Sequence, residues 1–310
     1  MALNPAVIVD QRVVARPSFS VGDWFRVLLR VVHGISDKNL SMISAGIAFF
    51  ASLALFPAIT AMISLYGYVS DPLIVQDNLT MLAPFLPEQV YTLVNDRVTE
   101  LVTARRSTLG LASLISLLLA LWSAQAGISS MISGLNAIMH ETQDRNFFVN
   151  LLVSYLLTLL LILGTILALV AVVILPVVMA FIPFDTLVVT FINIARWVIA
   201  LLSLTLAIGA LYRFGPNRRY RLPVYTFGTL VATGLWIGVS TSFSIYLSNF
   251  SNYDEIYGAL GTVVVLLMWF YLSAFAVLIG AELNAAIEEY AVDIIRKRAS
   301  QGQDDVGPAT

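Results

Sequence analysis

The sequence predicts an all-α fold: a polytopic membrane protein, built as a bundle of six transmembrane helices with an amphipathic outer loop. One observation is composition, since hydrophobic residues make up 59% of the chain and charged residues 12%, about half the charged share of a soluble domain. The other is patterning, because the charges are confined to short segments between long uncharged runs. Water cannot solvate so apolar a surface, so lipid is the expected solvent for most of the chain.

Six apolar runs are long enough to cross a membrane. Each exceeds the ~20 residues that a helix needs to span a hydrocarbon core about 30 Å thick. Backbone in lipid must satisfy its own hydrogen bonds, and runs this long fit helices rather than barrel strands. The runs are 39–70, 107–140, 146–184, 186–212 (interrupted by Arg196), 222–253 and 256–281.

Prolines predict where one of these helices bends and where another ends. Pro57 lies inside the first run and predicts a helix kink there. Pro176 and Pro183 occupy the end of the third run, so its helix is predicted over 147–175, with the fourth helix starting near Leu187.

The distribution of Lys and Arg predicts that both termini are cytoplasmic. With six helices, one side of the membrane receives Arg12, Arg16, Arg26, Arg30, Lys38, Arg145, Arg213, Arg218, Arg219, Arg221, Arg296, Lys297 and Arg298. The other side receives Arg97, Arg105 and Arg106, set among several acidic residues.

Three segments follow from this topology. Residues 1–38 are predicted to be a cytoplasmic segment, in which Val21–Ile35 forms an amphipathic helix lying in the membrane interface. Residues 39–287 form the six-helix domain, and residues 288–310 a cytoplasmic tail whose polar end, QGQDDVGPAT, is expected to be disordered.

The outer loop, 71–106, is the one sizeable segment expected outside the membrane. Its apolar residues recur at helical spacing after two prolines: Val90, Val94, Val98 and Leu101. About 35 residues cannot fold alone without disulfides or metal, so the loop is expected to pack on the outer helix ends.

Glu282 follows a long uncharged run and is the first candidate site residue. If its helix enters the membrane near Gly258, Glu282 lies about 36 Å along it, at or beyond the inner interface. One interpretation is a helix end at headgroup depth, where charge carries little penalty. The other is a carboxylate at the inner mouth of a cavity, binding a cation or proton. Asn284 does not share its face, and could assist only through a loop or a partner helix.

Arg196 is the second candidate, because the topology places it inside the fourth helix. An arginine within a membrane can reach the outer headgroups beside Trp197. Alternatively it faces the bundle, where it would suit an anionic substrate such as a phosphate headgroup.

The second helix is the most polar of the six and is expected at the centre of the bundle. Its polar residues are Ser123, Gln125, Ser129, Ser130, Ser133 and Asn136. They either bond neighbouring helices or contact a substrate. Ser130 with Gly134, and Gly234 with Gly238, have the small-xxx-small spacing of helix packing.

Catalytic, metal and cofactor sites are not predicted. The chain has no cysteine, and its two histidines, His33 and His140, are far apart and in no metal-binding motif. No nucleotide-binding or nucleophile motif is present. A net charge of −2 does not favour a nucleic-acid partner, since phosphate binding needs clustered Lys and Arg.

Several stretches carry a family resemblance. They are SAGIAFFASLALFPAI, ALWSAQAGISSMISGLN, LYRFGPNRRYR and FSIYLSNFSNYDEIYGALGTVVVLLMWFYLSAFAVLIGAELNA. In this order, over about residues 25 to 290, the chain resembles the YihY/BrkB family of bacterial inner-membrane proteins. The recognisable points are Asn217 of GPN, Tyr257-Gly258, and Gly280-Ala281-Glu282.

The resemblance implies a six-helix protein of the bacterial inner membrane. One branch is named for virulence and serum resistance, and an older family label is ribonuclease BN. The missing acid–base and metal groups argue against that label. We therefore expect a transporter or lipid-handling protein of unknown substrate, with membrane lipids and a small ion or lipid as its partners. The alternative is a non-transporting scaffold or accessory protein that docks partners through its outer loop. The sequence does not determine the oligomeric state.

Overall fold

The computed structural model describes residues 6–9, 12–15, 19–69, 95–96, 106–141, 145–175, 179, 186–218, 222–249 and 253–304. Nearly all of the described chain is helical, which confirms the predicted all-α class. The one departure is a short antiparallel hairpin of β1 (Ala6–Val9) and β2 (Arg12–Ala15), which the sequence analysis did not predict. Most of the predicted outer loop, including Val90, Val94 and Val98, lies outside the described residues.

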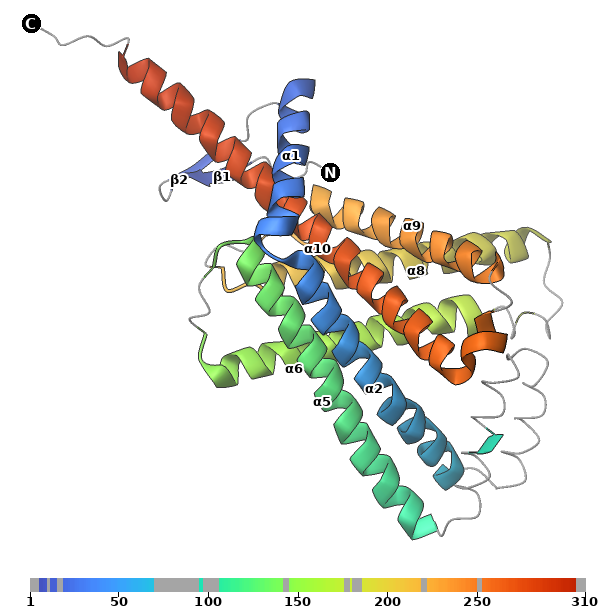
Figure 1. Cartoon of the computed structure of the whole chain (residues 1–310). Coiled ribbons are helices and arrows are strands. Elements are labelled where there is room, and N and C mark those ends of the chain that lie inside the picture. The colour runs from blue at the N-terminus through green and yellow to red at the C-terminus, as the bar shows by residue number, and fades with distance from the viewer. Residues whose placement is uncertain are drawn as a thin grey trace, which may run out of the picture. The chain divides into compact units, whose positions relative to one another are not determined.

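Six helices in the described chain are long and apolar enough to cross a membrane, as predicted. Figure 1 shows them with a shorter helix, α1 (Val21–Asp37), before the first. They are α2 (Leu40–Val69), α5 (Arg106–Ile138), α6 (Phe147–Leu169), α8 (Thr186–Phe214), α9 (Phe227–Asn249) and α10 (Tyr253–Asp304).

The third span is helical as far as the predicted residue, through a change of helix type. The π-helical segment η2 (Val170–Ile174) continues α6 as far as Leu175. A π turn widens the helix by one residue per turn and disturbs its regular bonding. α8 then begins within one residue of the predicted Leu187. Pro176 and Pro183 lie outside the described residues.

α2 passes through Pro57 without ending. The proline ring cannot donate a backbone hydrogen bond, so one bond of the helix is lost there. The kink itself stays a prediction.

α10 is much longer than the sixth predicted span. Its 52 residues correspond to about 78 Å at 1.5 Å per residue, so it extends well beyond a 30 Å hydrocarbon core. The sequence analysis expected disorder from Gln301, and this is corrected as far as Asp304, where the helix ends. The last six residues, 305–310, lie outside the described residues.

The chain divides into two compact units, which we describe separately. One comprises Met1–Ser44, Ser129–Ser240 and Leu272–Thr310, and the other comprises Ala45–Ile128 and Thr241–Tyr271. In the second unit, α5 packs closely on α2 at Gly127, where an added Cβ would lie 3.5 Å from the Cβ of Phe50.

The spans leave many large apolar side chains exposed on the chain itself. Examples are Phe49, Phe56, Leu114, Leu118, Phe191 and Leu230. A water-soluble monomer rarely exposes such continuous apolar area, whereas a membrane helix presents it to lipid.

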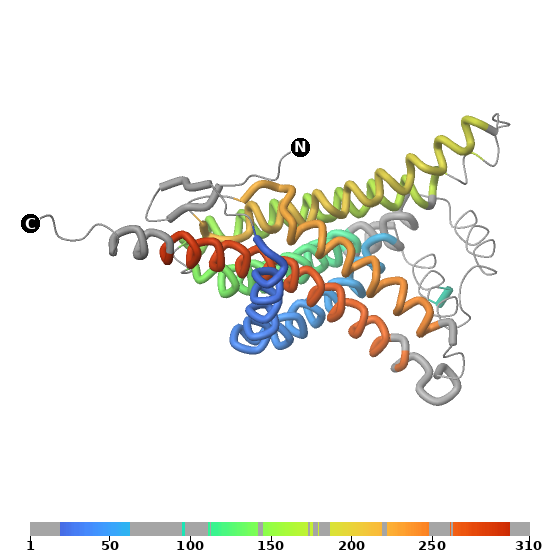
Figure 2. The backbone as a smooth tube through the Cα atoms, turned by 90° about the horizontal axis from the view of Figure 1, so that it is seen from above, coloured from blue at the N-terminus to red at the C-terminus, as the bar shows by residue number. Residues whose placement is uncertain are grey.

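In the first unit, α6 packs along α8, and α1 lies across α10 (Figure 2). The α1–α10 contact has an apolar core of Val27, Val31, Leu283, Ala286, Ile287 and Tyr290. The start of α1 is fixed by a capping box, in which Ser20 and Asp23 exchange side-chain and backbone hydrogen bonds.

α9 and α10 approach each other through two facing glycines. A Cβ added at Gly228 or at Gly280 would overlap the backbone of the other helix. The fully buried Tyr212 of α8 donates its hydroxyl hydrogen bond to the carbonyl of Val277 in the same region. Gly280, one of the residues that carry the family resemblance, is therefore required by backbone packing.

Candidate functional site

Glu282 forms a buried ion pair with Lys38. Its residue exposure is 2%, and the ammonium nitrogen of Lys38 lies 2.9 and 3.0 Å from the two carboxylate oxygens. Lys38 also donates to the carbonyl of Ile138, the last residue of α5, at 3.1 Å. An ammonium group has three donors, so these bonds use all of them, and the positive charge complements the negative end of α5.

The local backbone explains how Lys38 reaches Glu282. α1 ends at Asp37, and only Lys38 and Asn39 separate it from α2. Asn39 has φ of 52°, in the left-handed region that asparagine tolerates better than most residues. On α1, Gly34 faces the carboxylate so closely that an added Cβ would lie under 3.0 Å from it.

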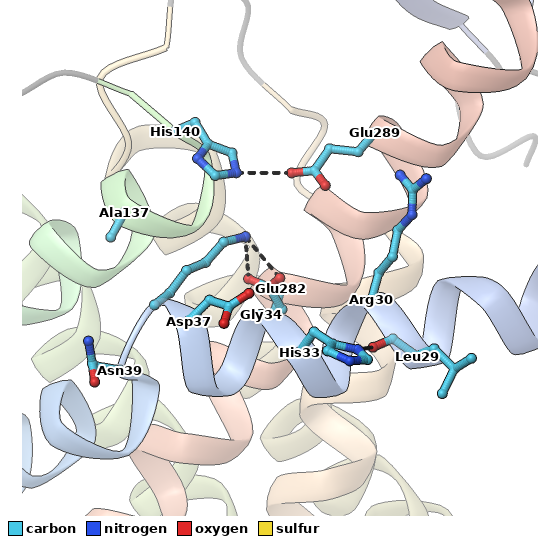
Figure 3. Close-up of a pocket in the computed structure, with 11 residues that line it drawn as sticks. Leu29, Arg30, His33, Gly34, Asp37, Asn39, Ala137, His140, Glu282 and Glu289 are labelled. Atoms are coloured by element: carbon cyan, nitrogen blue, oxygen red, sulfur yellow. Dashed lines mark hydrogen bonds and ion pairs between the residues drawn. The ribbon is translucent and has the colours of Figure 1, made fainter. Parts of the chain in front are cut away.

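The pair borders an open cavity of about 750 Å³ (Figure 3). The cavity is lined by Leu29, Arg30, His33, Gly34, Asp37, Lys38, Asn39, Ala137, His140, Glu282 and Glu289. At its rim, the Nε2 atom of His140 lies 3.2 Å from the carboxylate of Glu289. These residues come from α1 and the two residues after it, from the end of α5 and the residues that follow, and from α10, and they mix both signs of charge.

The buried charges have a clear chemical consequence. An ion pair removed from water loses solvation that its mutual attraction recovers only in part. Lys38 and Glu282 are fully paired with each other, but each would be a strong binding group if the other withdrew. The free carboxylate would attract a cation or proton, and the free ammonium an anionic group such as a phosphate.

A second polar cluster holds the loop after α8, beside the end of α5. Arg218 donates two parallel hydrogen bonds of 2.9 Å to Glu288 and one of 3.2 Å to Glu141. Burial alone would lower the pKa of Arg218, but the bonds and charges of Glu288 and then Glu141 outweigh it and raise that pKa. Arg145 donates to the carbonyls of Gly215 and Pro216 at 3.1 and 2.9 Å.

Asn136 belongs to this loop contact. Its side-chain oxygen accepts a 2.8 Å hydrogen bond from the backbone N–H of Asn217. Four of the candidates that the sequence analysis named lie in the first unit, namely Asn136, Arg196, Glu282 and Asn284. Asn136 positions a loop and does not line the cavity.

The side chain of Asn284 likewise holds backbone in place, at the start of α9. Its Oδ1 atom accepts from the N–H of Gly228 at 2.9 Å, and its Nδ2 donates to the hydroxyl of Thr226 at 2.8 Å. It therefore caps the N–H group of Gly228, one of the N–H groups at a helix start that the helix itself leaves without a partner. Both of these hydrogen bonds go to the start of α9, and assistance to Glu282 stays a prediction.

Arg196 lies in α8, away from the cavity lining. Its guanidinium carbon is 5.9 Å from the ring centroid of Trp197, a cation–π distance. Within the part of the chain that the structure describes, its buried Nε atom has no hydrogen-bond partner. Its depth in the membrane stays a prediction. Gln125 is buried in the other unit.

The two pairs with small-xxx-small spacing, Ser130 with Gly134 and Gly234 with Gly238, differ in how closely they are packed. Gly134 is closely packed, because an added Cβ would lie 2.9 Å from Ile43 and 3.3 Å from Leu278, while Ser130 is half-buried. At Gly234 and Gly238, an added Cβ meets nothing within 4 Å among the described residues. Close helix packing at that pair is therefore not found within this part of the chain.

Sequence reasoning missed Lys38 and Gly34 as parts of the site. Lys38 was counted among the cytoplasmic charges, although a lysine two residues before a 30-residue uncharged helix is a possible signal. Gly34 carried no signal, because its role depends on the crossing of α1 and α10. In the described residues, no group of three or more His, Cys, Asp or Glu could hold a metal.

Comparison with known proteins gives several similar sequences. The chain is 32% identical over 254 residues to the ribonuclease-like protein YfkH of Bacillus subtilis, covering 79% of this chain and 89% of YfkH. It is 27% identical over 209 residues to the UPF0761 membrane protein IL2447 of Idiomarina loihiensis, covering 67% and 70% of the two chains. No solved structure matches the chain.

A family model described as virulence factor BrkB matches residues 31–304. That range includes the six candidate spans of the described chain, together with Lys38 and Glu282. The resemblance seen in the GPN and Gly-Ala-Glu stretches is thereby confirmed, and the chain belongs to the virulence factor BrkB family of multi-pass membrane proteins.

Proposed function

We propose that this protein is a transporter or lipid-handling protein, which admits a small ion or a lipid headgroup to the cavity beside Lys38 and Glu282. The observation that supports this most is a carboxylate only 2% exposed within an apolar candidate span, at the wall of an open cavity. Well-packed apolar residues would often be at least as stable as a buried ion pair. Ionisable residues inside membrane spans commonly mark ion or substrate pathways.

The pair would act as an exchangeable contact. A cation or proton that enters the cavity competes with Lys38 for Glu282, and an anionic headgroup competes with Glu282 for Lys38. Lysine suits this use because its ammonium is a compact charge on a flexible stem. The cavity lining, with charges of both signs, offers either ligand a second contact.

Flux measurements on the purified protein in liposomes test the proposal. Uptake of cations and movement of labelled phospholipid are compared for wild type, Glu282→Gln, Lys38→Met and Arg196→Ala. Ion transport predicts at least a tenfold loss with Glu282→Gln, and phospholipid movement a similar loss with Lys38→Met. Asp293→Asn is the control, because it removes one partner of a half-exposed ion pair with Arg30, and Asp293 itself is not among the residues that line this cavity. If folded protein moves neither cations nor lipid, the proposal fails.

We also infer that the chain is not a ribonuclease. The name of YfkH describes that protein, and the support here is the net charge of −2 and the absence of a catalytic motif in the sequence. Cleavage of RNA by purified protein, with loss of activity in Glu282→Gln, would contradict this inference.

We further infer that the membrane is the bacterial inner membrane, with both termini in the cytoplasm. Arg145, Arg218 and Lys38 gather near one end of the first unit, which agrees with the positive-inside distribution. The chain has no cysteine, so a single cysteine at Arg219 can be labelled selectively. It should react with an impermeant reagent only after the membrane is opened.

A further inference from the structure

α1 presents three different faces. One face is buried against α10 and consists of Val27, Val31 and Gly34. A second face carries charged residues, including Arg26 and Arg30, and borders two cavities. The third face is apolar and exposed.

The apolar face forms a continuous row. Its members follow the i, i+4, i+7, i+8, i+11 spacing of one helix side, and all of them are exposed: Val21 (88%), Phe25 (64%), Leu28 (54%), Leu29 (44%) and Val32 (60%). We call these five residues the apolar row. If these five side chains of a 17-residue helix were exposed to water, the free-energy cost would grow with the apolar area that they expose.

The connection to α2 fixes the surroundings of α1. Only Lys38 and Asn39 separate the two helices, so the end of α1 lies within about 10 Å of the first residue of a candidate span. α1 also runs across the direction of α6 and α8, two spanning helices of the same unit (Figures 1 and 2). A helix that is joined directly to a span and runs crosswise to two spanning helices of its own unit has the direction expected of a helix along a membrane surface.

The charged face supports the same placement. The side chain of Arg26 is 69% exposed, and it lies about 100° or more around the helix from the middle of the row. Beside it is a second cavity of about 560 Å³, lined by Asp23, Arg26, Leu29, Arg30, Tyr290, Asp293, Ile294 and Lys297. Leu29 belongs to the row and lines both cavities, so the apolar row ends where the polar cavities begin.

We propose that α1 is an interfacial helix, and that the partner of the apolar row is the lipid leaflet into which α2 enters. The row lies below the headgroups, among the first acyl carbons, and Arg26 lies at the level of the phosphates. This is the arrangement of an amphipathic helix in a membrane surface, with its buried face, Val27, Val31 and Gly34, held by α10. The inference does not depend on whether the protein transports anything.

Spin labelling of the full-length protein in liposomes tests the placement. Because the chain has no cysteine, single variants Val21→Cys, Phe25→Cys, Leu28→Cys and Val32→Cys can each carry one nitroxide. Asp37→Cys, at an exposed position on the charged face, is the matched control on the same helix. Collision rates with oxygen, which partitions into lipid, and with a water-soluble nickel chelate are then measured.

The proposal expects the four row positions to collide more often with oxygen than with nickel chelate, and Asp37→Cys to show the opposite order. Equal nickel accessibility at the row and at Asp37→Cys would place the row in water and overturn the proposal. Low collision rates with both reagents, together with spin–spin broadening, would mean that a second copy of the chain covers the row, and would overturn it as well. These positions are exposed, so each labelled protein should unfold at the wild-type temperature.

Discussion

Gly34 of α1 faces the carboxylate of Glu282 in α10, and the space between them is too small for a methyl group. An added Cβ would approach both Oε1 and Cδ of Glu282 to under 3.0 Å, a distance that real Cβ atoms essentially never show. The glycine therefore lets the acid lie against the backbone of α1, where Lys38 can reach both of its oxygens.

Gly34→Ala should separate Glu282 from Lys38 and destabilise the protein by about 1–3 kcal/mol, the usual cost of overpacking. Gly22→Ala is the matched control on the same helix, because its added Cβ meets only Ser20 Oγ, at 3.8 Å. Alanine is a better helix former than glycine, so this control should be neutral or stabilise by up to about 1 kcal/mol. Unfolding in mixed detergent micelles measures both variants. Equal changes in unfolding free energy for the two variants would show that the close approach of Gly34 to Glu282 does not affect stability.

Removal of one partner from the Lys38–Glu282 pair should destabilise the protein more, per charge removed, than removal of both partners. Lys38→Met or Glu282→Leu leaves the other charge buried and unpaired, at a cost of about 3 kcal/mol each. The double variant should lose less than the sum of the single losses, because it leaves no unpaired charge. A double-mutant cycle of unfolding free energies gives the coupling.

The control for this cycle is the Arg30–Asp293 pair, whose side chains are 35% and 47% exposed. Exposed pairs contribute little, so Asp293→Asn should change stability by at most about 1 kcal/mol. Strictly additive losses for Lys38 and Glu282 would mean that the two charges are stabilised independently, against the geometry described above.

The six spans could be predicted because the free-energy penalty for charge in lipid leaves long, uniform runs in the sequence. The helical segment as far as Leu175 and the start of α8 near Leu187 followed from prolines and chain length. The length of α10 could not be predicted in this way, because its part beyond Glu282 carries charges and is held by packing on α1.

The site was predicted only in part. Glu282 was identified from the sequence, because a carboxylate after a long apolar run is unusual. Its partner Lys38 is 244 residues away along the chain, and no local pattern reports a contact at that separation. Asn284 was named as a possible helper of Glu282 through a loop or a partner helix, which stays a prediction; its two hydrogen bonds go to the start of α9.

Asn284→Ala should destabilise the protein by about 1–2 kcal/mol, because it removes the acceptor for Gly228 N–H and the donor to Thr226 in a buried setting. Asn146→Ala is a useful comparison. Asn146 also stands at the start of a helix, α6, but its side chain makes no capping hydrogen bond. Its replacement should therefore change the unfolding free energy by less than about 0.5 kcal/mol. If Asn146→Ala lost as much stability as Asn284→Ala, the capping hydrogen bonds would not explain the loss in Asn284→Ala.

Tyr290 should make stability depend on pH through Asp23. The Tyr290 hydroxyl donates to Asp23 at 2.6 Å, and this bond, followed by those from Ser20, lowers the pKa of Asp23 from 3.8 to about 2. A carboxyl whose pKa is lower in the folded state stabilises the protein above its unfolded pKa, and this contribution is lost as the pH falls from about 4 to about 2.

Tyr290→Phe removes that bond, raises the pKa of Asp23 and weakens the pH-dependent contribution. The difference in unfolding temperature between wild type and Tyr290→Phe should therefore be larger at about pH 5 than at about pH 2.5. Tyr225→Phe, at an exposed tyrosine, should show no such change with pH. If the Tyr290→Phe difference were the same at both pH values, the Tyr290 hydroxyl would not be what stabilises the charged form of Asp23. Its other contact, with the guanidinium of Arg26 at 3.0 Å, does not titrate in this range and would then account for the loss.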